Sequence, residues 1–150
     1  MSETNDLIKL YSTKILALAA EIPHLGRLEA PQASVKKRSP LCGSTVTVDL
    51  DMENGKVSRF GQEVKACALG QASAAVLGEA VIGRTAEELE GIAKDLEAML
   101  KQDGPVPAAP FDGYEALLPA REFKNRHASI LLSAQAAAEA ARQAEAKAAS

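Results

Sequence analysis

The feature that most constrains the fold is a β-hairpin pattern in the middle of the chain. Residues 45–50 alternate as a half-buried strand requires, with Val46, Val48 and Leu50 on one face and Thr45, Thr47 and Asp49 on the other. Asn54-Gly55 follows, and both residues tolerate the positive φ of a two-residue hairpin turn. Residues 56–64 should therefore return antiparallel to the first strand, with a bulge or an early strand end at Gly61.

An amphipathic helix is expected ahead of the hairpin. Apolar residues recur at helical spacing from Leu7 to Leu18, and candidate caps precede them at Ser2, Thr4 and Asn5. Pro23 ends this helix, because the residue before a proline is pushed out of the helical region. Residues 23–40 contain three prolines and one glycine, which predicts an extended, looping segment with one short strand near Ala33 to Lys37.

Three further helices are expected after the hairpin. Small side chains dominate residues 68–77, which predicts a buried central helix closed by Gly78 or Gly83. Thr85 and Glu88 form a capping-box pair that opens the next helix. Residues 102–113 read as a connection, and one long helix is expected beyond Pro119. The Ala-rich end of that helix, residues 135–150, is expected to be frayed and only partly docked.

Length and composition favour one compact domain over residues 1–150. The chain is 47% hydrophobic but only 3% aromatic, so its core must be aliphatic. A formal charge of −3 argues against nucleic acid or an anionic membrane surface as a partner, and the cluster Lys36-Lys37-Arg38 is typical of a solvated segment. The N-terminus lacks an export signal and no apolar run could span a bilayer, so we expect a cytoplasmic protein.

Two cysteines and one histidine carry the candidate chemistry. Cys42 lies on a Pro/Gly-rich turn, and Cys67 lies just before a helix, where backbone N–H groups and the helix dipole stabilise a thiolate. His127 could add an imidazole ligand. The spacing 42–67–127 matches no zinc finger or ribbon, and burial of Cys67 or His127 as a structural residue is the alternative. No nucleotide-binding or hydrolase motif is present, and we expect no enzymatic activity.

A series of short motifs resembles the iron–sulfur cluster scaffold family that comprises IscU, SufU and the N-terminal domain of NifU. The resemblance runs from about Tyr11 to Leu132. The motifs, in order, are Tyr11-Ser12-Thr13-Lys14, Pro23-His24-Leu25-Gly26-Arg27-Leu28, Pro40-Leu41-Cys42-Gly43, the Asn54-Gly55 hairpin, Val64-Lys65-Ala66-Cys67-Ala68, Gln71-Ala72-Ser73-Ala74, Ile82-Gly83-Arg84-Thr85 and Arg126-His127-Ala128-Ser129-Ile130-Leu131. The spacing of these motifs, with an insert between Leu100 and Phe123, resembles the SufU type more than the IscU type.

The resemblance implies an α+β fold, with a small, mostly antiparallel three-stranded sheet packed against several helices. It also implies that Cys42, Cys67 and His127 bind a labile [2Fe–2S] cluster or iron. The chain departs from the family pattern twice, since Ser44 replaces an aspartate and Ala128 replaces a third cysteine. A cluster takes four ligands, so the fourth position would come from Ser44, Glu63, water, a small thiol or a second chain.

The sequence therefore supports three hypotheses. The first is a divergent iron–sulfur cluster scaffold or carrier that works with a cysteine desulfurase and with cluster recipient or carrier proteins, as a monomer or a homodimer. The second is a zinc site of two Cys and one His. The third is a metal-free accessory protein that modulates a desulfurase or relays sulfur on Cys42 or Cys67.

Overall fold

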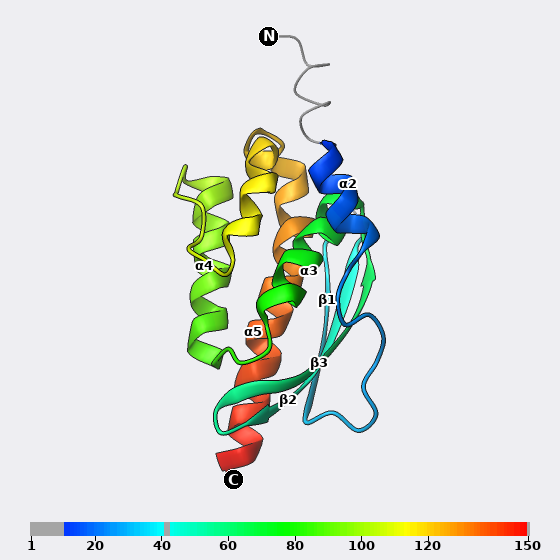
Figure 1. Cartoon of the computed structure of the whole chain (residues 1–150), viewed down its shortest axis with the longest axis vertical. Coiled ribbons are helices and arrows are strands. Elements are labelled where there is room, and N and C mark those ends of the chain that lie inside the picture. The colour runs from blue at the N-terminus through cyan, green and yellow to red at the C-terminus, as the bar shows by residue number, and fades with distance from the viewer. Residues whose placement is uncertain (1–10, 41–42, 150) are drawn as a thin grey trace.

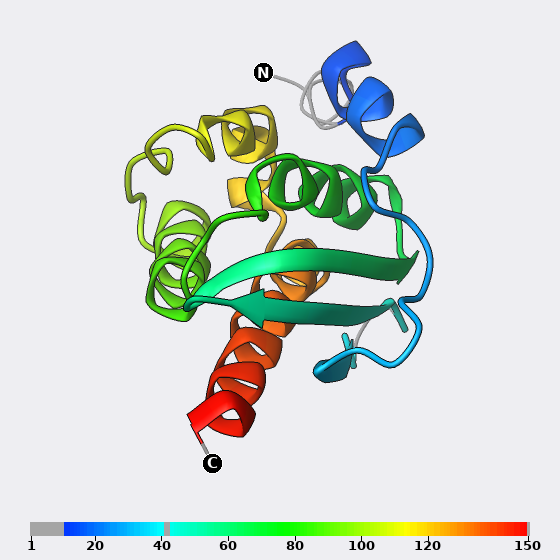
Figure 2. The same ribbon diagram turned by 60° about the horizontal axis from the view of Figure 1, so that its bottom comes forward.

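The computed structural model describes residues 11–40 and 43–149. It has an α+β fold in which a small antiparallel sheet packs against helices on one face (Figures 1 and 2). The elements in chain order are α2 (Thr13–Ala20), β1 (Ala33–Arg38), β2 (Thr45–Glu53), β3 (Lys56–Lys65), α3 (Ala68–Ala80), α4 (Ala86–Lys101), the 3₁₀ helices η1 (Asp112–Glu122) and η2 (Lys124–Arg126), and α5 (His127–Ala149). No helix in the described part is long and apolar enough to cross a membrane.

The three strands pair in the order β1-β2-β3, so the hairpin and the short preceding strand are both confirmed. Asn54 and Gly55 adopt the positive φ angles that the turn requires, 54° and 77°. The register shift lies between Asp51 and Met52, near the turn. The predicted bulge or strand end at Gly61 was therefore wrong, because β3 continues through it and pairs it with Asp49.

Gly61 is needed for close packing instead. A Cβ at this position would lie 2.6 Å from the carbonyl oxygen of Gly26. That close approach arises because the segment after α2 runs beside β3: the Gly26 N–H donates to the Gln62 carbonyl, and the Gln62 N–H donates to the His24 carbonyl. A side chain at position 61 would push this segment away from the sheet.

The outer face of the sheet is more buried than the alternating pattern of β2 predicted, because the segment after α2 covers part of this face. Asp49 has no exposed side-chain surface. Its carboxylate accepts hydrogen bonds from the Arg27 guanidinium at 2.6 Å, the Ser34 hydroxyl at 2.6 Å and the Leu28 N–H at 3.1 Å. Burial alone raises the pKa of Asp49, but these bonds from Arg27, Ser34 and Leu28 lower it below its ordinary value.

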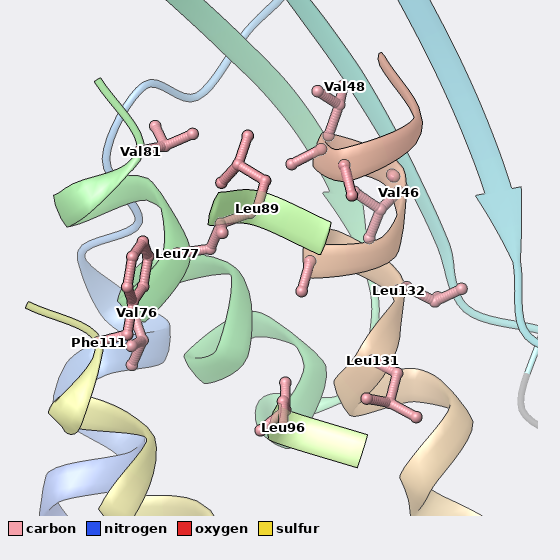
Figure 3. Packing of buried hydrophobic residues seen from close by; sticks show 14 of the residues in the cluster. Val46, Val48, Val76, Leu77, Val81, Leu89, Leu96, Phe111, Leu131 and Leu132 are labelled. Atoms are coloured by element: carbon pink, nitrogen blue, oxygen red, sulfur yellow. The ribbon is translucent and has the colours of Figure 1, made fainter. Parts of the chain in front are cut away.

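The inner face of the sheet packs on α5, and α3 lies between α2 and α5. The core is mostly aliphatic, with Phe60, Phe111 and Tyr114 as its buried aromatic residues (Figure 3). Most of α3 is buried, as its small residues predicted. Gly78 lies within the helix, and Gly83 follows it with φ 88°. The capping box of Thr85 and Glu88 at the start of α4 is confirmed.

The C-terminal region differs from the expected single helix. Residues 112–126 form the 3₁₀ helices η1 and η2, and the α-helix begins only at His127. Pro119, inside η1, has no N–H for an α-helical hydrogen bond and disfavours the α conformation in the residue before it. The packing of α5 also extends further than expected: buried alanines continue as far as Ala144, whereas residues 145–147 are exposed.

Candidate functional site

Cys67 is the N-cap residue of α3, between the end of β3 and the first helical turn. Its thiol is free and partly buried. Burial alone raises the thiol pKa, but neighbouring polar groups outweigh it. The Gly70 N–H, the Ser129 hydroxyl, the Leu69 N–H and the Arg126 guanidinium lie near the sulfur and lower the pKa of Cys67 below its ordinary value. The direction agrees with the prediction from the position of Cys67 before a helix, and two of the four groups come from outside that helix.

Ser129 connects Cys67 to the β1–β2 loop. Its hydroxyl oxygen lies 3.6 Å from the Cys67 sulfur and 3.0 Å from the Ser44 hydroxyl oxygen. A serine hydroxyl has one proton, so Ser129 donates to Ser44 while Cys67 is a neutral thiol and turns that proton toward the sulfur when Cys67 is ionised. Both serines are buried. Ser44 also accepts, through its backbone carbonyl, a hydrogen bond from the Ser39 N–H that closes the base of the loop. Residues from three distant parts of the chain thus meet at this end of the molecule.

Close packing fixes the first turn of α3 against α5. A Cβ added to Gly70 would lie 2.8 Å from the Ser129 hydroxyl oxygen and 2.8 Å from the Cβ of Ala66. Because no side chain fits there, the two helices approach closely enough for Ser129 to reach the Cys67 sulfur. Sequence reasoning assigned no role to Ser129, since the contact joins residues 62 positions apart and no local pattern reports it.

His127 is the first residue of α5 and its ring is buried, with 3% of the residue exposed. Its Nε2 lies 3.0 Å from the carbonyl oxygens of both Ala120 and Arg121. Carbonyls only accept hydrogen bonds, so Nε2 carries a proton and, in the neutral ring, the lone pair is on Nδ1. His127 also lines a cavity of about 560 Å³, together with Leu100, Lys101, Asp103, Arg121, Glu122 and Lys124.

The remaining predicted site residues are placed as follows. Cys42 lies outside the described residues. Ser44 is buried against Ser129, Glu63 is exposed on β3, and Ala128 is partly buried beside His127. Within residues 11–40 and 43–149, no three His, Cys, Asp or Glu side chains are close enough to hold one metal ion. The described residues therefore bring together Cys67, Ser44 and Ser129, and they place His127 at the start of the same helix as Ser129.

Comparison with known proteins identifies the family. The model of the NifU-like N-terminal domain family matches residues 10–120, well over half of the chain. The chain belongs to this family. The resemblance seen in the sequence motifs is thereby confirmed.

Two solved structures share the fold across almost the whole chain. A nitrogen-fixing NifU-like protein (N-terminal) from Brucella abortus is 44% identical with a TM-score of 0.91, covering 95% of this chain and 99% of that one. A protein from Fervidobacterium islandicum AW-1, described as an iron–sulfur cluster assembly scaffold for the SUF system, is 22% identical with a TM-score of 0.78, covering 89% and 98%. The second likeness shows the fold alone.

A curated relative carries a functional name. The iron–sulfur cluster assembly scaffold protein IscU of Thermotoga maritima is 30% identical over 90 residues, which are 60% of this chain and 63% of that protein. The matched region thus spans less than two thirds of the relative's length.

Proposed function

We propose that this member of the NifU-like family is a divergent iron–sulfur cluster assembly scaffold or carrier. It would bind a labile [2Fe–2S] cluster, or iron, as cargo through Cys42, Cys67 and His127. Family membership and the IscU relative support the scaffold class. The observation that carries the proposal for this chain is the environment of Cys67, whose thiol lies where four separate groups favour its anionic form.

Cys67 is suited to bind iron because thiolates, not thiols, are the ligands of iron–sulfur clusters. The N–H groups of Leu69 and Gly70 and the Arg126 guanidinium favour negative charge on this sulfur, so a metal that binds here displaces the proton more easily than from an ordinary thiol. The second proposed thiolate, Cys42, precedes Ser44 by two positions in the sequence. The hydrogen bond from Ser129 to Ser44 fixes that loop's C-terminal side near Cys67.

His127 is the proposed third ligand, through Nδ1. The two carbonyls that accept from Nε2 select the tautomer whose lone pair is on Nδ1 and fix the plane of the ring. Hydrogen bonding of one imidazole nitrogen commonly orients the other toward a metal. Because the ring is already buried and hydrogen-bonded, His127 loses little conformational freedom on binding a cargo ion.

The two departures from the family pattern define what this site would lack. A buried hydroxyl at Ser44, engaged with Ser129, is a weak ligand compared with an aspartate, and Ala128 offers no donor atom. The fourth position is therefore assigned to water, a small thiol or a second copy of the chain. Such a site holds its cargo loosely, as a carrier requires.

The rest of the proposal concerns context. We propose that residues 1–150 act as one cytoplasmic domain with no catalytic activity of its own, alone or as a homodimer. It would accept sulfur or a cluster from a cysteine desulfurase system and pass the cluster to recipient or carrier proteins.

Anaerobic reconstitution with iron and sulfide tests the proposal. The wild-type protein should develop visible charge-transfer absorption and bind iron and acid-labile sulfide in equal amounts. Cys67→Ser, Cys42→Ser and His127→Asn should each lose most of this chromophore. His24→Asn is the matched control, because His24 is the other histidine of the chain and lies exposed on the segment after α2. If no chromophore forms at any subunit ratio, the scaffold proposal is wrong.

The same preparations separate the alternatives. If the wild-type protein contains close to one zinc ion per chain and Cys67→Ser does not, the site is a zinc site. If the protein folds without metal, and its effect on a cysteine desulfurase is unchanged in the Cys42→Ser, Cys67→Ser double variant, the protein is a metal-free accessory protein. In a sulfur relay, a donor persulfide would transfer its outer sulfur to the Cys42 or Cys67 thiolate and be left as a thiol. Mass spectrometry after incubation with a desulfurase and cysteine would then show one added sulfur on the acceptor.

A further inference from the structure

Carboxylates pair with five of the seven arginines in this acidic chain. The five ion pairs are Arg27–Asp49, Arg59–Asp51, Arg84–Glu88, Arg121–Asp103 and Arg142–Glu90. Among the described residues, the two arginines without a carboxylate partner are Arg38 and Arg126. Both lie at the end of the molecule that holds Cys67, where the loop after β1 and the start of α5 meet the start of α3 (top of Figure 1).

The strand register places a second cation level with Arg38. Arg38 is opposite Thr45, and Thr45 is opposite Lys65, so the three residues form one row across the end of the sheet. Directly opposed residues of antiparallel strands share a face. The neighbouring residue Lys37 forms an ion pair with Glu139 of α5, so Lys37 is on the face of the sheet that packs against the helices. Successive residues of a strand point to opposite faces, so Arg38, and with it Lys65, is on the outer face.

This outward row is exposed and mostly uncompensated. Arg38 and Lys65 are both exposed, and Lys36 lies exposed on the same face two residues before Arg38. The acidic residue on this part of the face is Glu63, opposite Thr47. None of the three cations forms an ion pair within the described part of the chain, whereas Lys37, on the other face, does. The positive charge continues to Arg126, which acts on the Cys67 thiol directly.

The separation of the cations favours a peptide over a small anion. Arg38 and Lys65 lie on the two strands that flank β2, so their backbones are two strand spacings apart, about 9.5 Å. One carboxylate or phosphate is too small to bind both. An extended peptide advances about 3.3 Å per residue and its side chains alternate between faces, so carboxylates on one face lie about 7 Å apart at i, i+2 and about 13 Å apart at i, i+4. These separations bracket the spacing of the cations, and the long Arg and Lys side chains cover the difference.

We propose that Arg38, Lys65 and Lys36 form a docking surface, the cationic rim, for an acidic peptide segment of the protein that exchanges sulfur or cluster with this chain at Cys67. The inference rests on the proposed function, since it names the chemistry of the partner at that site. Lys65, the last residue of β3, precedes Cys67 by two positions, so a partner segment bound at the rim brings its own reactive group beside the thiol. A chain with a net charge of −3 would otherwise repel such a segment.

Thiol reactivity with charged probes tests the cationic rim without any metal. In a Cys42→Ser background, Cys67 is the one thiol, and its rate is measured with the dianion 5,5′-dithiobis(2-nitrobenzoate) and with neutral 2,2′-dithiodipyridine. The ratio of the two rates cancels changes in the thiol itself and reports the local field. Arg38→Glu with Lys65→Glu should lower the ratio about fivefold to tenfold at low salt, and added salt should shrink the difference. Lys56→Glu with Lys94→Glu, the same charge change at the start of β3 and on α4, should leave the ratio nearly unchanged.

A second arm distinguishes peptide docking from general attraction of anions. A hexaglutamate peptide should slow the dianionic reagent at much lower carboxylate concentration than free glutamate does, and the Arg38→Glu, Lys65→Glu protein should lose this protection. Two results would refute the proposed cationic rim. One is an equal decrease of the rate ratio in both double variants, and the other is protection of Cys67 by hexaglutamate that is no stronger than protection by free glutamate. Since the assay needs no cluster, failed reconstitution and a failed rim are separate results.

Discussion

The hydroxyl of Ser129 should control the reactivity of Cys67, and Ser129→Ala measures its contribution. The Ser129 oxygen lies 3.6 Å from the sulfur, a long contact, and it is one of several groups that lower the pKa of Cys67. A hydrogen bond to a charged group contributes about 1.5–3 kcal/mol, and two facts favour the lower end of that range: the long distance, and the single Ser129 proton, which has to leave Ser44 to reach the sulfur. A loss of about 1.4 kcal/mol is a factor of ten. The variant should therefore have a higher thiol pKa and, where the thiol is mostly protonated, react about tenfold more slowly.

The assay is the pH dependence of iodoacetamide alkylation in a Cys42→Ser background. Removing the hydroxyl should move the inflection of the rate profile to higher pH while leaving the plateau at high pH nearly unchanged, because the fully ionised thiolate is the same nucleophile. Ser133→Ala is the matched control: Ser133 lies one turn further along α5, is equally buried, and its hydroxyl has no hydrogen-bond partner among the residues that the structure describes. An unshifted profile in Ser129→Ala, or equal shifts in both variants, would refute this account of the thiol.

Three further predictions concern stability and the missing ligand. Asp49→Asn should destabilise the fold by about 2–3 kcal/mol in chemical denaturation, because it removes the charge of a buried carboxylate that accepts hydrogen bonds from Arg27, Ser34 and Leu28. Because the pKa of Asp49 is lower in the folded state, its carboxylate stabilises the native state fully above the unfolded-state pKa of about 3.9. This stabilisation is lost as the pH falls through the lower folded-state pKa. On acidification below pH 4, the free energy of unfolding should therefore decrease less in Asp49→Asn than in the wild type. Gly70→Ala should cost about 1–3 kcal/mol and also slow Cys67 alkylation, since its Cβ would displace Ser129. Ala128→Cys should slow the loss of a reconstituted cluster to a chelator, because it adds a third thiolate; an unchanged loss rate would place position 128 outside the site.

Local sequence pattern predicted the elements whose signals are themselves local. The alternation of 45–50 with Asn54-Gly55 gave the hairpin, and Thr85 with Glu88 gave the start of α4. The pattern was less informative at Asp49, which looks like an exposed residue of a half-buried strand. Its burial depends on Arg27 and Leu28, which cross the sheet from a segment more than 20 residues earlier.

The site shows the same division. The position of Cys67 before a helix was enough to predict a stabilised thiolate, because the backbone N–H groups of Leu69 and Gly70 come with the helix itself. The contribution of Ser129 required the packing of α3 against α5 through Gly70, which is a tertiary contact. The tautomer of His127 likewise depends on two carbonyls of a 3₁₀ segment that the sequence suggested was part of an α-helix.

The most direct test of the scaffold proposal is the metal and acid-labile sulfide content of protein purified without oxygen, compared between the wild type and Cys67→Ser. The account predicts iron and sulfide in equal amounts in the wild type and a loss of both in Cys67→Ser. Wild-type protein that contains neither iron nor sulfide, or a variant that retains both at the wild-type level, would contradict it.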